Sequence, residues 1–476
     1  MQAKNSAKKS KHILGLVIVD GVGYRNFILS DFIYQSLNNF DEVIVYSGLP
    51  SESFEIPGQE NVKIIELPIF KESGRTWFWR KAKEVAHMQL HKKYTGIKYN
   101  LQKNYPSSKS RRAQVTKFIF RLTSEFHSEK WINRFYRKQV STFKNSEIFK
   151  SYKDILENIN PDILFFTHQR PPYLAPLDFT AKKLGIKTCS FIFSWDNLPS
   201  KGRMAASFDS FLVWSDLMKK ELNYFYPETE GQSVEVVGTP QFEPYVLDGY
   251  KSSKEEFYKK FGLDPALKTI CYSCGDASTS KNDPVYIGVI AKLIEQKKLK
   301  EDINFLVRTS PAEDGSRFRD VEENFSFINW NYPKWELTRK DHPEPWSQRV
   351  PLAEDLIDLR SLLENCDLNI NMCSTMSLDF MLFDKPVVNP AFGTGENDLY
   401  DDQKYLQYSH YKRVVESGAV AIVKNEEQLL REINFSLKNP EARLKEQKEL
   451  IKLQIGKPLE GTSKRIAAAL KTISEA

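Results

Sequence analysis

Small hydroxyl residues stand in the second half of the chain where a predicted strand gives way to a predicted helix. The short buried strand is expected over 368–372, and Ser374 and Thr375 follow it at once. Helical spacing then runs over 376–383. Free backbone N–H groups and the positive end of a helix dipole both favour a phosphate. We therefore predict that this elbow holds a diphosphate, the alternative being that Ser374 only caps a helix.

A carboxylate follows the elbow by one helical turn. Asp379 stands four residues after Thr375, so the two side chains are expected on the same helix face. A carboxylate in that place can accept hydrogen bonds from a ribose diol. Together the elbow and Asp379 predict a nucleotide site.

Polar residues also follow four predicted strands in the first half of the chain. They are Asp20, His168, Asp196 and Ser215. In a doubly wound parallel sheet the carboxyl ends of the strands line one crevice. Asp20, Asp196 and His168, in that order of preference, are the candidate general bases for a reaction in the crevice. The alternative for Asp196 is a structural role, in which it braces the loop that contains Trp195.

The elements that must position these residues alternate between strand and helix. A chain of 476 residues is longer than one core usually organises. We predict an α/β protein with a Rossmann-like N-terminal domain over 1–245 and a Rossmann-like C-terminal domain over 254–455. A final helix over 456–476 is expected to pack back toward the N-terminal domain. The segment 332–349 is expected to be a long surface loop.

Residues 71–150 interrupt the alternation. This stretch holds 20 lysines and arginines against 5 acidic residues, a net charge of +15, so the rest of the chain carries −9. Aromatic residues are interleaved with the basic ones, and the spacing is helical. Basic helices with aromatic residues suit the surface of an anionic membrane or a lipid-linked substrate. A solvated basic subdomain and, less favoured, nucleic-acid binding are the alternatives.

Composition and small motifs exclude several classes of protein. Hydrophobic residues make up 41% and charged residues 27%, which is typical of a globular chain and not of a disordered one. No apolar run reaches membrane-spanning length, and the basic N-terminus lacks a signal peptide's apolar segment, so we expect a cytoplasmic protein. The five cysteines are expected to be reduced core residues. Gly21 and Gly23 alone make a weak dinucleotide signal.

At this point the sequence resembles a family. The segment 373–388 looks like the C-terminal half of GT-B glycosyltransferases of bacterial surface-polysaccharide and capsule synthesis. The group lies near the CDP-glycerol glycerophosphotransferases and the UDP-N-acetylglucosamine epimerases. Further similar segments are 194–202, 237–240, 410–413, 426–429 and 438–440. The resemblance implies a GT-B fold, with two Rossmann-like domains facing a cleft. It spans about 161–476 and is weak for the basic insert.

The resemblance also implies roles for individual residues of the donor site. Gly275 would close a turn near the donor phosphates, while Arg308 and Glu313 would stand where the family has a segment that faces the donor. Ser374 and Thr375 would contact the diphosphate. Asp379 stands where many relatives have the longer glutamate for the ribose.

The expected function is transfer of a sugar from a nucleotide-sugar donor to a surface glycan or polyprenyl-linked acceptor. The transfer would take place at the inner face of the cell membrane, where residues 71–150 would contact the anionic lipid surface. We expect no metal and no cofactor besides the nucleotide-sugar co-substrate. The alternatives are transfer of a polyol phosphate from a CDP-activated donor, with His168 as base, and a non-catalytic membrane or nucleic-acid adaptor on the same fold.

Overall fold

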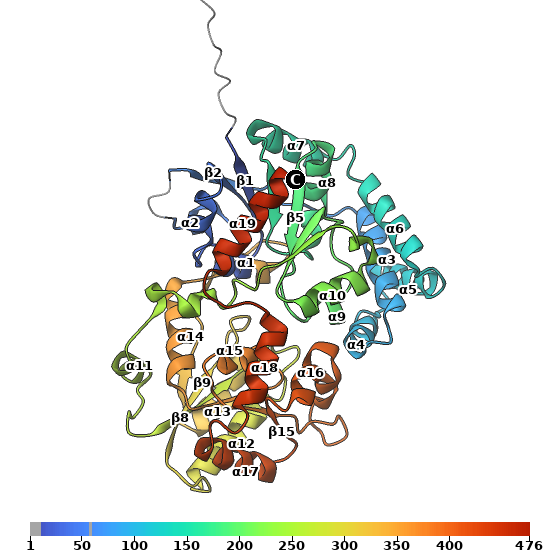
Figure 1. The fold of residues 1–476 in the computed structure, drawn as a ribbon. Coiled ribbons are helices and arrows are strands. Elements are labelled where there is room, and N and C mark those ends of the chain that lie inside the picture. Colours follow the sequence, from blue (N-terminus) through green and yellow to red (C-terminus); the bar gives the residue numbers. More distant parts are fainter. Residues whose placement is uncertain (1–10, 57–59) are drawn as a thin grey trace, which may run out of the picture.

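Two parallel sheets, each covered by helices, make up the body of the molecule (Figure 1). The computed structural model describes residues 11–56 and 60–476. Most of the N-terminal segment that we predicted not to be a signal peptide therefore lies outside the described residues. The strand–helix alternation and the α/β class are confirmed.

The first sheet has seven strands in the order β3-β2-β1-β4-β5-β6-β7. Its strands are β1 Ile13–Ile18, β2 Glu42–Ser47, β3 Val62–Glu66, β4 Ile163–Phe166, β5 Lys187–Phe191, β6 Ser210–Val213 and β7 Ser233–Val236. Strands β2 and β3 lie on one side of β1, and β5, β6 and β7 lie on the opposite side, beyond β4. Strands β1 and β4 themselves pair in parallel. The space beyond their carboxyl ends is therefore the switch point, where open α/β sheets bind ligands.

The second sheet has six strands in the order β10-β9-β8-β13-β14-β15. They are β8 Lys268–Ser273, β9 Ile303–Arg308, β10 Asn329–Asn331, β13 Leu368–Ile370, β14 Val387–Pro390 and β15 Ala421–Val423. Here the order reverses between β8 and β13, which also pair in parallel. The elbow that we predicted from the sequence follows β13 directly, so it stands at the second switch point.

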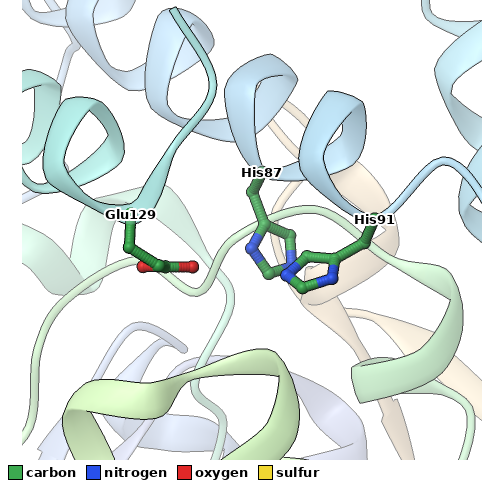
Figure 2. A group of neighbouring side chains, drawn as sticks. All are labelled: His87, His91 and Glu129. Atoms are coloured by element: carbon green, nitrogen blue, oxygen red, sulfur yellow. The ribbon is translucent and has the colours of Figure 1, made fainter.

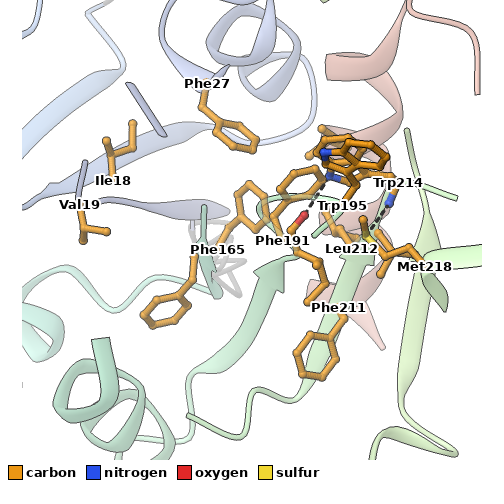
Figure 3. Close-up of a cluster of buried hydrophobic side chains, with 14 of the residues drawn as sticks. Ile18, Val19, Phe27, Phe165, Phe191, Trp195, Phe211, Leu212, Trp214 and Met218 are labelled. Atoms are coloured by element: carbon orange, nitrogen blue, oxygen red, sulfur yellow. Dashed lines mark hydrogen bonds between the residues drawn. The ribbon is translucent and has the colours of Figure 1, made fainter. Parts of the chain in front are cut away.

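Aromatic side chains fill the core of the first sheet (Figure 3). Phe27 packs edge-on against Phe165 with ring centroids 5.3 Å apart, and both are fully buried. The indole of Trp214 donates a hydrogen bond of 2.9 Å to the carbonyl of Ile192, which satisfies its one polar atom inside the core. This rigid packing fixes the strand ends that carry the predicted catalytic residues.

Helices cover both sheets, and some differ from the prediction. Outside the insert they are α1 Gly21–Phe27, α2 Phe32–Leu37, α8 Ala175–Lys183, α9 Asn197–Ser200, α10 Asp216–Phe225, α11 Lys254–Phe261, α12 Asp283–Glu295, α13 Arg319–Asn324, α14 Ala353–Asn365, α15 Met376–Met381, α16 Ser409–Ser417, α17 Glu426–Lys438, α18 Leu444–Ile455 and α19 Thr462–Glu475. Helical spacing over 27–37 predicts one helix there, whereas α1 ends at Phe27 and α2 begins only at Phe32. The sequence after Asn389 predicts a helix-poor loop as far as Val414, whereas α16 already begins at Ser409.

The basic segment folds into helices that stand beside the first sheet (Figure 1). They are α3 Gly74–Leu90, α4 Thr95–Lys103, α5 Arg111–Glu125, α6 Glu129–Ser141 and α7 Glu147–Ile159. Many of their aromatic residues pack helix against helix, as in the stacked pair Trp79 and Phe135 at 6.1 Å. Phe118 on α5, by contrast, is 55% exposed.

The segment predicted as a surface loop, 332–349, is instead a hairpin that joins the domains. Strands β11 Trp335–Leu337 and β12 Arg349–Pro351 pair antiparallel. A Cβ atom added to Gly21 would lie 1.6 Å from the carbonyl oxygen of Arg349, so a glycine is needed where β12 meets α1. The close approach that Gly21 permits is therefore to this chain's own backbone.

The C-terminal helices run back across the molecule. Helix α18 contacts α10, α15 and α16, and α19 then lies against α2 (Figure 1). The ammonium of Lys187 on β5 donates to the carbonyl oxygens of Ile473 and Ser474 at the end of α19. The end of the chain thus packs on the first sheet. The exact domain boundaries stay predictions.

Candidate functional site

A histidine and an aspartate meet at the switch point of the first sheet. Asp20 follows β1 and caps α1, where Oδ1 accepts a hydrogen bond of 2.7 Å from the backbone N–H of Gly23. Its other oxygen, Oδ2, lies 2.8 Å from Nδ1 of His168, which follows β4. Because β1 and β4 are adjacent and parallel, residues 148 apart in sequence come into contact. This contact holds the proton of a neutral His168 on Nδ1 and leaves Nε2 as an acceptor.

Burial governs the chemistry of His168. Its ring stacks on Phe193 with centroids 3.9 Å apart, and its Nε2 atom is buried without a hydrogen-bond partner among the described residues. Burial lowers the pKa of His168 below the ordinary 6.5, while the hydrogen bond with Asp20 works in the opposite direction. A neutral imidazole oriented by a carboxylate can accept a proton at Nε2.

Asp196, the other candidate base, lies at the end of the loop after β5. Its Oδ2 atom is 3.1 Å from the ammonium of Lys201. Burial alone would raise the pKa of Asp196, but Lys201 and His410 hold it well below its usual range. A carboxylate held so firmly in its ionised form is a weak base, so Asp196 suits charge pairing in the cleft better than proton abstraction.

The elbow after β13 is built on a strained residue. Cys373 has a φ of +50°, a left-handed conformation that costs a non-glycine residue about 1–2 kcal/mol. The backbone N–H of Ser374 donates to Oδ1 of Asn371 at 2.9 Å, and Ser374 Oγ accepts from the N–H of Met376 at 3.3 Å. The elbow thus uses some of the donors that we expected to be free, because Asn371 lies beneath it.

The hydroxyl of Thr375 contacts the opposite domain. It accepts a hydrogen bond of 3.1 Å from the indole N–H of Trp195. Helix α15, which follows, has six residues and is shorter than predicted. Thr375 therefore helps to fix how the two switch points face each other.

Two cavities meet at the elbow. One of about 340 Å³ is lined by Trp195, Asp196 and His410, and the other of about 280 Å³ by Arg25, Arg308 and Asp379. Both are lined by a shared set of residues, namely Gly275, Asp276, Ser374 and Thr375. The predicted donor residues Gly275, Ser374 and Thr375 thus come together, between the two domains.

Asp379 is engaged in a contact between the domains. The hydroxyl of Tyr245 donates a hydrogen bond to Oδ1 of Asp379, and Arg25 of α1 donates to the same hydroxyl at 3.4 Å. Asp379 is only 4% exposed, and burial raises its pKa to about 6. Its side chain still lines the smaller cavity, but Tyr245 occupies one of the oxygens that we assigned to a ribose.

Gly275 lies where only a glycine fits. A Cβ atom there would come within 2.0 Å of Ser280 Oγ. Its backbone N–H donates to Asp283 at 2.9 Å, and its carbonyl accepts from Arg317. Glu313, predicted to face the donor, instead holds the guanidinium of Arg317 through two hydrogen bonds of 2.6 and 2.9 Å.

Arg308 is paired within its own domain. Its guanidinium makes two hydrogen bonds of 2.9 and 3.0 Å to the carboxylate of Asp355 and a third to Asn331. All three side chains are buried. Arg308 lines the smaller cavity, but its charge is already matched by Asp355.

Arg25 and His410 belong to the site although sequence reasoning missed them. Arg25 is 8% exposed and donates 2.9 Å to the carbonyl of Gln241, with no carboxylate in ion-pair distance among residues 11–56 and 60–476. His410 lies beside the ring of Trp195 at 5.1 Å, and burial lowers its pKa to about 4. Nothing in the local pattern marks Arg25. His410 belonged to a segment used only for the resemblance.

A third cavity, of about 410 Å³, adjoins the carboxyl ends of β1 and β3. Apolar residues line much of it, with Phe70, Leu174 and Leu177 among them. Lys71 and Arg112 of the basic segment also reach it, as does Glu344 of the hairpin segment. This cavity has an apolar wall and a charged side, where Lys71, Arg80 and Arg112 stand with Glu72 and Glu344.

Comparisons with known proteins identify the fold. No protein-family model and no curated protein matches the sequence. Among solved structures, one from Listeria monocytogenes, assigned as a UDP-N-acetylglucosamine 2-epimerase, is similar over 98% of this chain and 97% of its own, with 10% identity and a TM-score of 0.52. A glycosyltransferase from Rickettsia africae is similar over 98% and 99%, with 14% identity and a TM-score of 0.51.

A plant structure has the same arrangement. Medicago truncatula UGT71G1, solved with UDP-glucose, is similar over 98% of both chains, with 12% identity and a TM-score of 0.50. Identities this low show the architecture and leave the chemistry open. This chain has the GT-B fold, in which two Rossmann-like domains face each other across a cleft.

Proposed function

We propose that the protein transfers a glycosyl group from a nucleotide-sugar donor to an acceptor held by the N-terminal domain. The observation that carries this proposal is the cleft between the two switch points. Gly275, Ser374 and Thr375 line two joined cavities from the C-terminal domain, and Arg25 and Asp196 line them from the N-terminal domain. Asp20 orients His168 at the ends of β1 and β4, although neither residue lines these two cavities. A donor site opposite a candidate base is the arrangement that such transfer needs.

The donor would lie against the elbow. A leaving nucleoside diphosphate gains negative charge in the transition state, so hydrogen-bond donors and cations near it speed the reaction. The hydroxyls of Ser374 and Thr375 can supply hydrogen bonds. Arg25 can supply charge, since no carboxylate pairs with it among the described residues, whereas Arg308 is paired with Asp355. We therefore favour Arg25 over Arg308 as the cation for the donor. The proposed chemistry uses no metal in the cleft.

His168 is the preferred base, ahead of Asp20 and Asp196. Among the side-chain atoms of these three residues, Nε2 of His168 is the buried one that has no hydrogen-bond partner in the described parts of the chain. The lowered pKa of His168 favours the neutral ring, which can accept a proton there. Asp20 would act by holding the imidazole and by stabilising its charged form after proton transfer. This choice applies to an inverting reaction.

The acceptor would enter through the third cavity. Its apolar wall suits a hydrocarbon or sugar face, and Lys71 with Arg112 suits a phosphate, which together fit a polyprenyl-linked glycan. Helix α5 exposes Val115 and Phe118 next to Arg121, a combination that suits an anionic membrane surface. We propose that the protein works there as a peripheral protein, on the cytoplasmic face. Among the described residues no helix is long and apolar enough to cross a membrane.

A thermal-shift panel with UDP, GDP, CDP, ADP and their sugar conjugates tests the donor site. A ligand at about 100 times its dissociation constant adds roughly 2.7 kcal/mol of stability. We expect one base class to stabilise the parent protein, and the shift to fall in Arg25→Gln and Ser374→Ala. Arg360→Gln measures general loss of stability, because Arg360 is a buried arginine that donates to the carbonyl of Leu247 outside the two cavities. If no nucleotide stabilises the parent, the proposal is wrong.

Transfer of a polyol phosphate from a CDP-activated donor is the second candidate. The observation in its favour is the His168–Asp20 pair, since a histidine base in the N-terminal domain is what that chemistry was expected to use. Turnover assays with CDP-glycerol and with UDP-sugars separate the two. Activity with CDP-glycerol alone would replace the main proposal.

A further inference from the structure

Two histidines and a glutamate converge in the helical segment, away from the cleft. His87 lies in the last turn of α3 and His91 directly follows that helix, while Glu129 begins α6. The histidines are four positions apart in the sequence, so both rings emerge from the same face. One potential ligand atom from each of the three residues lies within 4.8 Å of the others, and Figure 2 shows the side chains pointing toward one another.

Each of these three residues has a polar side-chain atom that is unused. Nε2 of His87, Nε2 of His91 and Oε2 of Glu129 are buried and have no hydrogen-bond partner among the described residues. His87 is fully buried and His91 is 7% exposed. Buried polar atoms are nearly always paired, so three unpaired atoms in one place call for a ligand.

The ligand that suits these atoms is a metal ion. Two imidazole nitrogens and one carboxylate oxygen form a set that zinc and related divalent ions prefer, with a fourth position left for water. Ligand atoms around one tetrahedral zinc lie about 3.3 Å apart for bonds of about 2.0–2.1 Å. Small rotations of the three side chains would therefore bring their ligand atoms to the separation that one zinc ion needs.

Arg203 contacts this group and opposes a cation here, as do the charges of Lys83 near His87 and Lys93 near His91. The NH1 atom of Arg203 lies 3.4 Å from Nδ1 of His87 and 3.1 Å from Oε1 of Glu129. Glu228 pairs with the other end of the guanidinium and offsets its charge. A metal on Nε2 requires the proton on Nδ1 of His87, so Arg203 must move off that ring and stay with the two glutamates. Metal binding and the Arg203–His87 contact exclude each other.

We propose that His87, His91 and Glu129 bind one divalent transition-metal ion, with zinc the best fit, and that the ion fastens α3 to α6. The two helices already pack along each other, and the stack of Trp79 on Phe135 continues the same interface. The ion would stabilise the basic segment. It takes no part in the proposed transfer, whose cleft is built from other residues.

Metal analysis of the full-length protein tests the site. The protein is stripped with a chelator, titrated with zinc at pH 7.5 and analysed for bound metal by mass spectrometry. We expect one zinc per chain and a rise in melting temperature with zinc concentration. Outer-shell substitutions already cost about 10- to 100-fold in metal affinity, so loss of a ligand in His87→Gln should cost at least as much.

Two further variants make the outcome decisive. Glu129→Gln changes a half-buried residue at a helix start, so it tests the site if His87→Gln does not fold. His127→Gln is the matched control, since His127 lies nearby but outside the group and bonds to the carbonyl of Thr123. Visible absorption of tetrahedral cobalt in the parent, lost in Glu129→Gln and kept in His127→Gln, supports the proposal. No saturable zinc or cobalt binding by the parent, or equal loss in His127→Gln, overturns it.

Discussion

Nδ1 of His168 lies 2.8 Å from Oδ2 of Asp20, across the switch point between β4 and β1. Each residue was a candidate base on its own in the sequence. Their contact makes them a pair, in which the carboxylate sets the tautomer and orientation of the imidazole. The predictions below start from this pair.

Replacing His168 should remove catalysis and spare donor binding. We expect His168→Ala to lower kcat by about 10²- to 10⁴-fold, the usual contribution of a general base, with an unchanged thermal shift by nucleotide. Asp20→Asn should also lower kcat. Because Asp20 raises the pKa of His168, its loss should move the acid limb of the pH–rate profile to lower pH. If Asp196→Asn abolishes turnover while His168→Ala keeps it, Asp196 is the base.

The buried Asp379 should make stability depend on pH between about 4 and 7. Its folded pKa, raised from 3.8 to about 6, means that the fold favours the protonated acid. Stability from this group is complete below pH 3.8 and is lost as pH rises through 6. In Asp379→Asn we expect that change to disappear, a difference on the order of 2 kcal/mol. Denaturant unfolding of both proteins at pH 4.5 and 7.5 measures it, and parallel curves would contradict it.

The ion pair between Arg308 and Asp355 predicts a loss of stability when Asp355 is replaced. Asp355→Ala leaves a buried guanidinium without its carboxylate and should lower the free energy of unfolding by about 3–5 kcal/mol. The exposed pair Lys153 and Glu157 is the control, and Lys153→Ala should change stability by about 0.5 kcal/mol or less. Chemical denaturation gives both numbers. A loss in Asp355→Ala below about 1 kcal/mol would mean that the charge of Arg308 is free for the donor.

The exposed face of α5 should bind anionic vesicles. Each Lys or Arg near such a surface contributes roughly 1 kcal/mol, so Arg121→Ser should weaken binding by about fivefold. Phe118→Ser should weaken it further by removing an apolar side chain that is 55% exposed. Cosedimentation with vesicles that contain phosphatidylserine measures this. Lys259→Ser on α11, which lies at the other side of the molecule in Figure 1, should bind as the parent does.

The sequence by itself determined the local structure and the places where chemistry could occur. Short apolar runs and helical spacing predicted both strand–helix series, because these patterns depend on neighbours within a few residues. The same spacing put Asp20, His168 and Ser374 at strand ends. It could not place the helix break inside 27–37 or the hairpin over 335–351, since both depend on packing against distant segments.

Only the tertiary structure decided which of these residues meet. Strand order puts β1 beside β4 and thereby joins Asp20 to His168, while long-range pairing commits Arg308 to Asp355. The contact from Arg25 to Tyr245 spans 220 residues of sequence. Charge pairing and burial depend on the whole fold. Local spacing therefore fixes where a side chain points along its own element, but the packed fold decides what it touches.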